Sequence, residues 1–418
     1  MNPSNSVAKQ KAVLVSIATD TAEIDACERS LAELSRLLDT AGGETFATVI
    51  QTKDHFDPKT CIGSGKCLEI KQLCHDNQIH LAIFDFELSP SQIRNLEEVF
   101  EDVEVIDRSM LILDIFAMHA QSAEGKLQVE VAQLKYTAPR LVGKGKELSR
   151  QEGRIGTRGP GESKLETDRR HLKSRLYALE QALDELEQKR KVMRSARDRS
   201  EMVKIAIVGY TNAGKSTLLN AMTDAGVLSE DKLFATLDAT TRRLILENGE
   251  PVLLTDTVGL IRKLPHHLIK AFRSTLDEVR YADMIMVVAD ASDPEVDEHI
   301  AVTESILSDL DAQDKPTLYA YNKCDLIRGD WPTSSREDTV FFSATTGQGI
   351  DRLSSALCRM VSEQKKRVTL YFPYTEQSKV SALYQQCQVE SVEYLEDSVK
   401  VVAVLSKKHL GRYTDYVR

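Results

Sequence analysis

Short apolar runs alternate with amphipathic stretches in the N-terminal part of the chain. The runs are rich in Val, Ile, Leu and Phe and have the length of buried strands: 12–17, 46–50, 81–86 and 103–106. Apolar residues recur every three or four positions over 23–39 and 90–100, which predicts two amphipathic helices. Since strands that alternate with helices usually form a parallel sheet, we expect an N-terminal α/β domain over residues 1–107.

The next segment has helical periodicity. Residues 108–137 predict one long helix, and a second helix follows after a gap. The second helix carries leucines at alternating steps of four and three: Leu172, Leu176, Leu179, Leu183 and Leu186. Because such a seam packs against a partner helix, we expect an antiparallel helical hairpin over residues 108–200.

The gap between the two helices, residues 139–170, is rich in glycine and arginine and has little to bury. Its basic residues outnumber the nearby acids: Arg140, Lys144, Lys146, Arg150, Arg154, Arg158 and Lys164. The whole chain has a formal net charge of −10, so it needs a local basic site to bind a polyanion. The composition leaves two interpretations open, a long loop that contacts RNA and a flexible linker.

The last part of the chain, residues 366–418, predicts a small α+β domain. Its expected strands are residues 368–372, 389–394 and 399–405, and its expected helices are residues 376–387 and 407–416.

Composition narrows the class of protein. Hydrophobic residues make up 42% of the 418 positions and charged residues 28%, which is typical of globular domains. The apolar runs are too short to span a bilayer, and the N-terminus lacks the apolar core of a signal peptide. None of the seven cysteines forms a C-x-x-C pair, as is common for reduced cytosolic thiols. We therefore expect a cytoplasmic protein without a membrane span, and a monomer.

Two signals in the N-terminal domain are weak. Cys61, Cys67, Cys74 and His75 lie close in the sequence, but their spacing fits no zinc pattern. Residues 62–66, Ile-Gly-Ser-Gly-Lys, form a glycine loop that is equally typical of a nucleotide site and of the turn that enters a helix.

The strongest chemical signal follows another apolar run, residues 203–208. The run leads directly into a G-x-x-x-x-G-K-S motif: Gly209-Tyr210-Thr211-Asn212-Ala213-Gly214-Lys215-Ser216. Two glycines let backbone N–H groups approach a polyphosphate, Lys215 adds positive charge, and Ser216 can hold Mg²⁺. The helix expected from Thr217 onward directs its positive end toward the phosphates.

A second motif, D-x-x-G, ends the apolar run at 253–254 and reads Asp256-Thr257-Val258-Gly259. Asp256 can reach the coordination shell of Mg²⁺, and the Gly259 N–H can contact a γ-phosphate. Alone the motif is a common turn, but it follows the phosphate loop in the expected order.

Two further motifs specify the base. The strand expected at 317–321 runs into N-K-x-D, Asn322-Lys323-Cys324-Asp325. The Asp325 carboxylate can accept two hydrogen bonds from guanine, whereas adenine would leave it unpaired at a cost of about 1–3 kcal/mol. A last short strand ends in Ser343-Ala344, where a backbone N–H can meet guanine O6. The four motifs together predict a site for GTP and GDP.

This set resembles the translation-factor-related class of P-loop GTPases over residues 201–365. The resemblance implies a parallel sheet with flanking helices, GTP hydrolysis, and a switch I threonine that contacts Mg²⁺ and the γ-phosphate. We assign that threonine to Thr236, with Thr240 and Thr241 as alternatives. The implied metal ligands are then Ser216 and Thr236, and the implied catalytic groups are Lys215, Thr236 and Gly259.

Two departures from the usual pattern bear on the rate. Many GTPases orient the attacking water with a Gln directly after D-x-x-G, but here that residue is Leu260. Slow intrinsic hydrolysis follows unless a partner supplies the missing group. An asparagine at the position of Asn212 can coordinate K⁺ in related GTPases, so potassium stimulation is a hypothesis that rests on analogy.

Three longer motifs resemble the HflX family of GTPases, and the match runs through almost the entire chain. They are residues 156–170, GTRGPGESKLETDRR, residues 125–130, GKLQVE, and residues 262–266, RKLPH. The resemblance implies binding to the large (50S) ribosomal subunit and its rRNA, with the hairpin loop near the peptidyl-transferase region. It also implies ribosome splitting or rescue, notably under stress. A GTPase switch or scaffold that acts on a protein partner is the alternative, and we find no persuasive constellation for an RNA-modifying enzyme.

Overall fold

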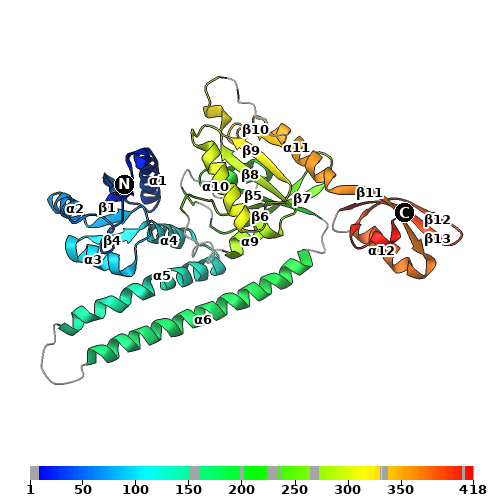
Figure 1. Ribbon diagram of the computed structural model, residues 1–418. Coiled ribbons are helices and arrows are strands. Elements are labelled where there is room, and N and C mark those ends of the chain that lie inside the picture. The colour runs from blue at the N-terminus through cyan, green and yellow to red at the C-terminus, as the bar shows by residue number, and fades with distance from the viewer. Residues whose placement is uncertain are drawn as a thin grey trace, which may run out of the picture. The chain divides into compact units, whose positions relative to one another are not determined.

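The chain folds into two compact units. The first comprises Met1–Leu186 with Glu230–Asp238 and Ile261–Thr275, and the second comprises Glu187–Ser229, Ala239–Leu260 and Leu276–Arg418. The computed structural model describes residues 9–150, 160–197, 202–223, 233–234, 237–263, 273–329, 331, 338–406 and 410–417 (Figure 1).

The N-terminal domain is a four-stranded parallel sheet in the order β2-β1-β3-β4. Its strands are β1 (Lys11–Ala18), β2 (Glu44–Thr52), β3 (Leu81–Phe84) and β4 (Glu104–Asp107). Its helices are α1 (Ile24–Thr40), α2 (Ser64–Asn77) and α3 (Pro90–Phe100). Because helices cover a parallel sheet, the central strand β1 is buried along nearly its whole length. The structure confirms the α/β domain that the alternating pattern predicts.

The glycine loop at 62–66 is the entry to helix α2. Gly63 caps the helix, and its N–H donates to Gln51 Oε1 at 2.8 Å. Cys67 and Cys74 face the hydrophobic core, and burial raises the pKa of the Cys74 thiol to about 11. Within the described ranges, no three His, Cys, Asp or Glu side chains are placed to hold a metal ion.

The long helix expected over 108–137 is in fact two helices, α4 (Arg108–His119) and α5 (Ala123–Arg150). Ala120 leaves the helical conformation, with φ −64° and ψ 113°. Ser122 then starts the next helix, because its Oγ accepts a hydrogen bond from Gly125 N at 2.8 Å. Serine competes for backbone hydrogen bonds in this way and so favours helix starts over helix interiors.

The expected loop at 139–170 is largely helical, which corrects the prediction. Helix α5 continues to Arg150 through Pro139, and helix α6 (Pro160–Arg197) begins at a proline, a residue that suits the first helical position. Glycine costs about 1 kcal/mol in a helix, which the leucine, lysine, glutamate and arginine around it can outweigh. The prediction of a loop therefore still concerns only residues 151–159, which lie outside the described residues.

Helices α5 and α6 form the expected antiparallel hairpin (Figure 1). Ion pairs join them, Lys135 to Glu180 at 2.7 Å and Arg175 to Glu130. The leucines of the predicted seam are all partly buried: Leu172, Leu176, Leu179, Leu183 and Leu186.

The second unit contains a six-stranded sheet in the order β10-β9-β8-β5-β7-β6, in which only β6 runs antiparallel to its neighbour. The strands are β5 (Val203–Val208), β6 (Thr240–Ile245), β7 (Pro251–Asp256), β8 (Met284–Asp290), β9 (Thr317–Asn322) and β10 (Thr339–Phe341). The helices described with it are α7 (Lys215–Thr223), α9 (Arg273–Tyr281), α10 (Val296–Asp309) and α11 (Ile350–Glu363).

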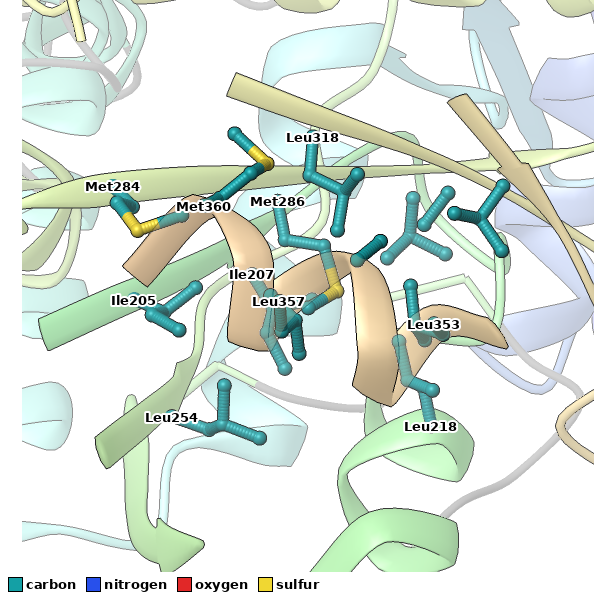
Figure 2. Close-up of a cluster of buried hydrophobic side chains, with 14 of the residues drawn as sticks. Ile205, Ile207, Leu218, Leu254, Met284, Met286, Leu318, Leu353, Leu357 and Met360 are labelled. Atoms are coloured by element: carbon teal, nitrogen blue, oxygen red, sulfur yellow. The ribbon is translucent and has the colours of Figure 1, made fainter. Parts of the chain in front are cut away.

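One face of this sheet packs on helices α7 and α11 (Figure 2). Ile205, Ile207 and Met286 from the strands meet Leu218 of α7 and Leu357 of α11, and all are essentially inaccessible to solvent. Each side chain of this kind contributes about 1.5–3 kcal/mol by its burial. The core thereby holds the parallel strands in register, so that their carboxyl ends meet at one edge of the sheet.

The C-terminal domain is an antiparallel sheet in the order β11-β13-β12, with helix α12. Its elements are β11 (Lys365–Pro373), α12 (Gln377–Gln386), β12 (Gln388–Tyr394) and β13 (Ser398–Ser406). Of the helix expected over 407–416, residues 407–409 lie outside the described residues, Leu410 is helical, and Thr414–Tyr416 forms a 3-10 turn. Tyr416 stacks on Phe372 with ring centroids 4.7 Å apart, which holds this turn against the sheet.

The predicted fold class is confirmed: a P-loop-type sheet, an N-terminal α/β domain with a helical hairpin, and a small α+β domain. No helix in the part of the chain that the structure describes is long and apolar enough to cross a membrane.

Candidate nucleotide-binding site

The phosphate loop leaves the end of β5 along a path that neighbouring backbone confines. Gly209 has φ 153°, and a Cβ there would lie 2.1 Å from Val288 O of β8. Gly214 has φ 92°, and its Cβ would lie 2.2 Å from Asn322 Nδ2. Side chains are therefore excluded at both glycines of the motif, because neighbouring protein atoms occupy the space that a Cβ would need.

Lys215 lies at the centre of the loop and is only 6% exposed. Its Nζ donates to the carbonyl oxygens of Gly209 at 3.1 Å and Tyr210 at 2.9 Å. Burial lowers the pKa of Lys215 to about 8, and the charge of Asp256 opposes this effect. The loop thus holds a desolvated cation, which a phosphate would stabilise.

Ser216 and Asp256 come together although they belong to different motifs. Ser216 Oγ donates to Asp256 Oδ2 at 2.6 Å, and Asp256 is fully buried at the end of β7. A hydroxyl and a carboxylate are hard oxygen donors, the kind of ligand that Mg²⁺ prefers. The donor set therefore fits a magnesium site.

The switch I assignment cannot be placed, because Thr236 lies outside the described residues. Of its alternatives, Thr240 begins β6 opposite Asp256. Thr241 lies beside Thr255, with their Oγ1 atoms 3.0 Å apart, so it takes part in cross-strand pairing.

The D-x-x-G segment folds back against the phosphate loop. Leu260 N donates to Gly209 O at 3.0 Å, and Thr211 N donates to Leu260 O at 2.8 Å. A Cβ on Gly259 would lie 2.7 Å from Thr211 Cγ2 and 3.2 Å from Lys215 Nζ. Gly259 is thus next to residues that the motif predicts to bind phosphate.

Other predicted residues have structural roles. Thr257 Oγ1 donates to Ile207 O at 2.8 Å, and Val258 is buried. Asn212 adopts a left-handed φ of 61°, which asparagine tolerates better than most residues. Thr217, in the first turn of α7, is partly buried.

Asn322 links three of the four motifs. Its Nδ2 donates to Ala213 O of the phosphate loop at 2.9 Å, and its Oδ1 accepts from Ala344 N at 2.9 Å. The motif pointed to Asn322, but sequence reasoning missed this linking role. Of the Ser343-Ala344 segment, where a backbone N–H is expected to meet guanine O6, the Ala344 N–H donates to Asn322 in this structure.

The residues predicted to recognise the base surround the end of β9. Asp325 is exposed in the turn Cys324–Leu326, so its carboxylate is accessible to a base. Lys323 has φ 63°, and its Nζ lies 2.8 Å from Asp290 Oδ2. Ser343 is fully buried, and its Oγ accepts from Thr346 N at 3.2 Å, which shapes the loop after β10.

Sequence reasoning also missed two residues that adjoin the site. Asp290 pairs with Lys323 as described, and the His299 ring stacks on Tyr210 with centroids 3.8 Å apart and planes at 15°. Both partners are distant from them in the sequence, and no motif contains either residue. Only the fold could identify them.

Comparison with known proteins agrees with this arrangement. Residues 28–117 match the family "GTP-binding GTPase N-terminal", residues 119–197 match "GTP-binding GTPase Middle Region", and residues 204–323 match "50S ribosome-binding GTPase".

Full-length relatives extend the agreement. The GTPase HflX of Caldanaerobacter subterraneus subsp. tengcongensis is 45% identical over 409 residues, covering 98% of this chain and 94% of the relative. The GTPase HflX of Escherichia coli K12 is 42% identical over 376 residues, covering 89% and 88%. A GDP complex of a GTP-binding protein from Sulfolobus solfataricus is 26% identical, covering 85% of this chain and 99% of that one, with a TM-score of 0.43. The chain therefore belongs to the HflX family of P-loop GTPases, and it binds guanine nucleotides and hydrolyses GTP.

Proposed function

We propose that GTP binds where the carboxyl ends of β5, β7 and β9 meet. The amides of residues 209–217 and the Lys215 ammonium hold the phosphates, and Gly259 contacts the γ-phosphate. Asp325 selects guanine, and the segments at Asn322–Lys323 and Ser343–Ala344 frame the base. Ser216 and Thr236 hold Mg²⁺, which supplies charge neutralisation on the phosphates when it is bound.

The observation that carries this assignment is the convergence of separate motifs on one point. Ser216 of the phosphate loop bonds to Asp256 at 2.6 Å, and Asn322 connects that loop to Ala344. A calorimetric titration with GDP and GTP tests it. Loss of guanine-nucleotide binding in Lys215→Ala, with binding retained in the distant Lys9→Ala, supports the assignment. Unchanged binding in Lys215→Ala contradicts it.

We also propose that hydrolysis depends on a group supplied from outside the chain. Leu260 occupies the position of the water-orienting glutamine and is 3% exposed. Because its side chain is aliphatic, it neither donates nor accepts a hydrogen bond and cannot orient the attacking water.

Asn212 provides a second way to speed hydrolysis, in which a bound K⁺ adds positive charge near the transferring phosphate. Equal turnover in sodium and potassium buffers would reject the potassium hypothesis.

The proposed activator is the large ribosomal subunit, which the chain engages in the cytoplasm as a monomer to promote ribosome splitting or rescue. The matched family carries ribosome binding in its description, and the HflX relatives named above match this chain over 89–98% of its length. The basic residues near the hairpin tip offer a local attraction for rRNA in a chain whose net charge is −10. Because Leu260 leaves a catalytic role unfilled, added 50S subunits should raise GTP turnover.

Co-migration in sucrose gradients with a non-hydrolysable GTP analogue tests the ribosome proposal. Since helices α5 and α6 extend to Arg150 and from Pro160, the informative change is confined to residues 151–159. A glycine-serine segment of equal length replaces them in one variant, and Arg154→Ser with Arg158→Ser removes only charge in another. Both variants should bind nucleotide normally and lose 50S co-migration. Retained co-migration would show that the tip does not read RNA, and absence of wild-type co-migration would favour a protein partner.

A further inference from the structure

A pair of stacked rings joins the phosphate loop to helix α10 within the second compact unit. The His299 ring lies almost parallel to the Tyr210 ring, with centroids 3.8 Å apart and planes at 15°. Both residues are buried, with Tyr210 7% exposed and His299 9% exposed. Because two aromatic rings in contact gain energy beyond that of their burial, the stack favours one position of the Tyr210 side chain.

The main chain around Tyr210 has a separate support, which comes from the residue after D-x-x-G. Leu260 N donates to Gly209 O at 3.0 Å, and Thr211 N donates to Leu260 O at 2.8 Å. These two hydrogen bonds are made by the neighbours of Tyr210 on either side. The backbone of the loop is therefore fixed by Leu260, and the Tyr210 side chain is fixed by His299.

The position of Tyr210 matters because its carbonyl oxygen contacts the lysine of the loop. Lys215 Nζ donates to Tyr210 O at 2.9 Å, and Ala213 N donates to the same oxygen at 3.3 Å. A rotation of Tyr210 would therefore disturb both Lys215 and the turn at Ala213. The conformation of this one residue is coupled to several groups that the motif predicts to bind phosphate.

The His299 ring is itself flanked by two carboxylates from the turn that begins α10. Its Nδ1 lies 3.6 Å from Asp293 Oδ2, and its Nε2 lies 4.0 Å from Glu295 Oε2. Glu295 N donates to Asp293 Oδ1 at 2.9 Å, and His299 N donates to Glu295 O at 3.0 Å. The turn thus carries polar groups that face both ring nitrogens, which defines the orientation of the ring.

The same turn is attached to the end of the sheet. Ala291 N donates to Asn322 O at 2.8 Å, and Asp290 Oδ2 lies 2.8 Å from Lys323 Nζ. The turn after β8 therefore contacts the N-K-x-D segment directly and the phosphate loop through His299. A side chain can position another only if its own support is fixed, and these contacts provide that support.

We propose that His299 is a positioning residue for nucleotide binding, whose ring holds Tyr210 so that the phosphate loop is already formed when a nucleotide arrives. A loop that is only partly in the competent conformation binds more weakly in proportion to the competent fraction. The role of His299 is indirect, because it acts through Tyr210. The inference rests on the phosphate site proposed above and adds to it a residue that belongs to none of the four motifs.

Calorimetric titration of the full-length protein with GDP tests this role. His299→Asn removes the ring and keeps a polar amide in place of the Nδ1 that faces Asp293. We expect GDP to bind this variant about three- to tenfold more weakly, which corresponds to the contribution of an aromatic pair. His299→Gln takes its place if His299→Asn does not fold.

The rescue variant is His299→Phe, which keeps a ring and removes the two nitrogens. It should bind GDP within about twofold of the wild type, because the contact with Tyr210 is retained. His299→Tyr replaces it if His299→Phe does not fold. A role that depended on the polarity of His299 would give the opposite order, with the amide variant closer to the wild type than the ring variant.

Two controls separate positioning from a general loss of structure. Tyr416→Leu removes one ring of the stack on Phe372 in the C-terminal domain, and it should lower the Tm without changing GDP affinity. Inosine diphosphate lacks the 2-amino group of guanine, so the ratio of its affinity to that of GDP reports on the base site. This ratio should be the same in His299→Asn and the wild type, since the substitution affects the phosphate loop.

Three results would overturn the positioning role: unchanged GDP affinity in His299→Asn, equal weakening in the amide and ring variants, or an altered ratio of inosine diphosphate to GDP. Weakening of GDP binding by Tyr416→Leu to the same extent would also overturn it. None of these results affects the site itself if Lys215→Ala abolishes binding. Retained binding in Lys215→Ala would reject the phosphate site and the role of His299 together.

Discussion

Replacing Lys215 by methionine should make the nucleotide-free protein more stable while abolishing its triphosphate binding. Lys215 is only 6% exposed, and no phosphate neutralises its charge until a nucleotide binds. Methionine has a similar length and flexibility and carries no charge, so it can fill the same space. The substitution therefore measures how much the buried charge of Lys215 destabilises the protein when no nucleotide is bound.

The magnitude follows from the pKa of Lys215. Burial lowers it from 10.5 to about 8, and each unit corresponds to about 1.4 kcal/mol, so the ionised lysine costs about 3 kcal/mol near neutral pH. The two carbonyl acceptors keep other donors, since Gly209 O accepts from Leu260 N at 3.0 Å and Tyr210 O from Ala213 N at 3.3 Å. Neither carbonyl oxygen loses its last hydrogen-bond donor, so we expect the substitution to raise the free energy of unfolding by about 1–3 kcal/mol.

The pH dependence has a defined sign. Because the folded-state pKa of about 8 lies below the ordinary value of 10.5, the unfolded chain binds more protons between these two pH values. The wild type therefore gains stability as pH rises through this window. The advantage of Lys215→Met is complete below about pH 8 and disappears toward pH 10.5.

Thermal unfolding monitored by Trp331 fluorescence measures the effect, since this single tryptophan reports on the second unit. A gain of this size raises the Tm of a domain of this length by roughly 2–10 °C. Adding GDP should raise the Tm of the wild type and leave that of the variant unchanged. A lower Tm for nucleotide-free Lys215→Met, or a difference that stays constant between pH 7.5 and 9.5, would refute the reasoning.

Three further predictions concern the rest of the site. Asp325→Asn should transfer preference from GTP to xanthosine triphosphate, because an amide suits the altered base edge; a competition assay that still favours GTP would place the base elsewhere. Gly214→Ala should weaken nucleotide binding at least about tenfold, since its Cβ would lie 2.2 Å from Asn322 Nδ2, whereas Gly249→Ala, also at positive φ but with open space, controls for backbone strain. Ser216→Ala should reduce GTP turnover about 100-fold and raise the Mg²⁺ concentration needed for half-maximal rate, and an unchanged requirement would remove Ser216 from the metal site.

Local patterns were sufficient for much of the fold. The alternating runs predicted the four parallel strands of the N-terminal sheet, and the leucine steps predicted the seam of α6. The phosphate loop could equally be predicted from the sequence, because phosphate binding needs particular residues at fixed positions close together in the chain. Gly209 and Gly214 cannot carry side chains there, so the sequence records the geometry directly.

The errors arose where distant residues decide local structure, and in one case where neighbouring helix formers outweigh glycine. The break between α4 and α5 is stabilised by Asp238, a residue more than 100 positions away that no local pattern connects with Ser122. The glycines before Arg150 suggested a loop, but the residues around them favour a helix strongly enough to continue it. Neither Asp290 nor His299 belongs to a motif, because each contacts the site only through the folded sheet and helix α10.

The sequence by itself determined the family, the reaction and the identity of the base, since those depend on side-chain chemistry at fixed spacings. Only the tertiary structure decided that Asn322 joins the phosphate loop to Ala344 and that Lys263 is held by Asp85. The physical reason is that such contacts depend on which buried polar groups meet in space. A buried polar group needs a hydrogen-bond partner, but the order of residues along the chain does not show which partner it contacts.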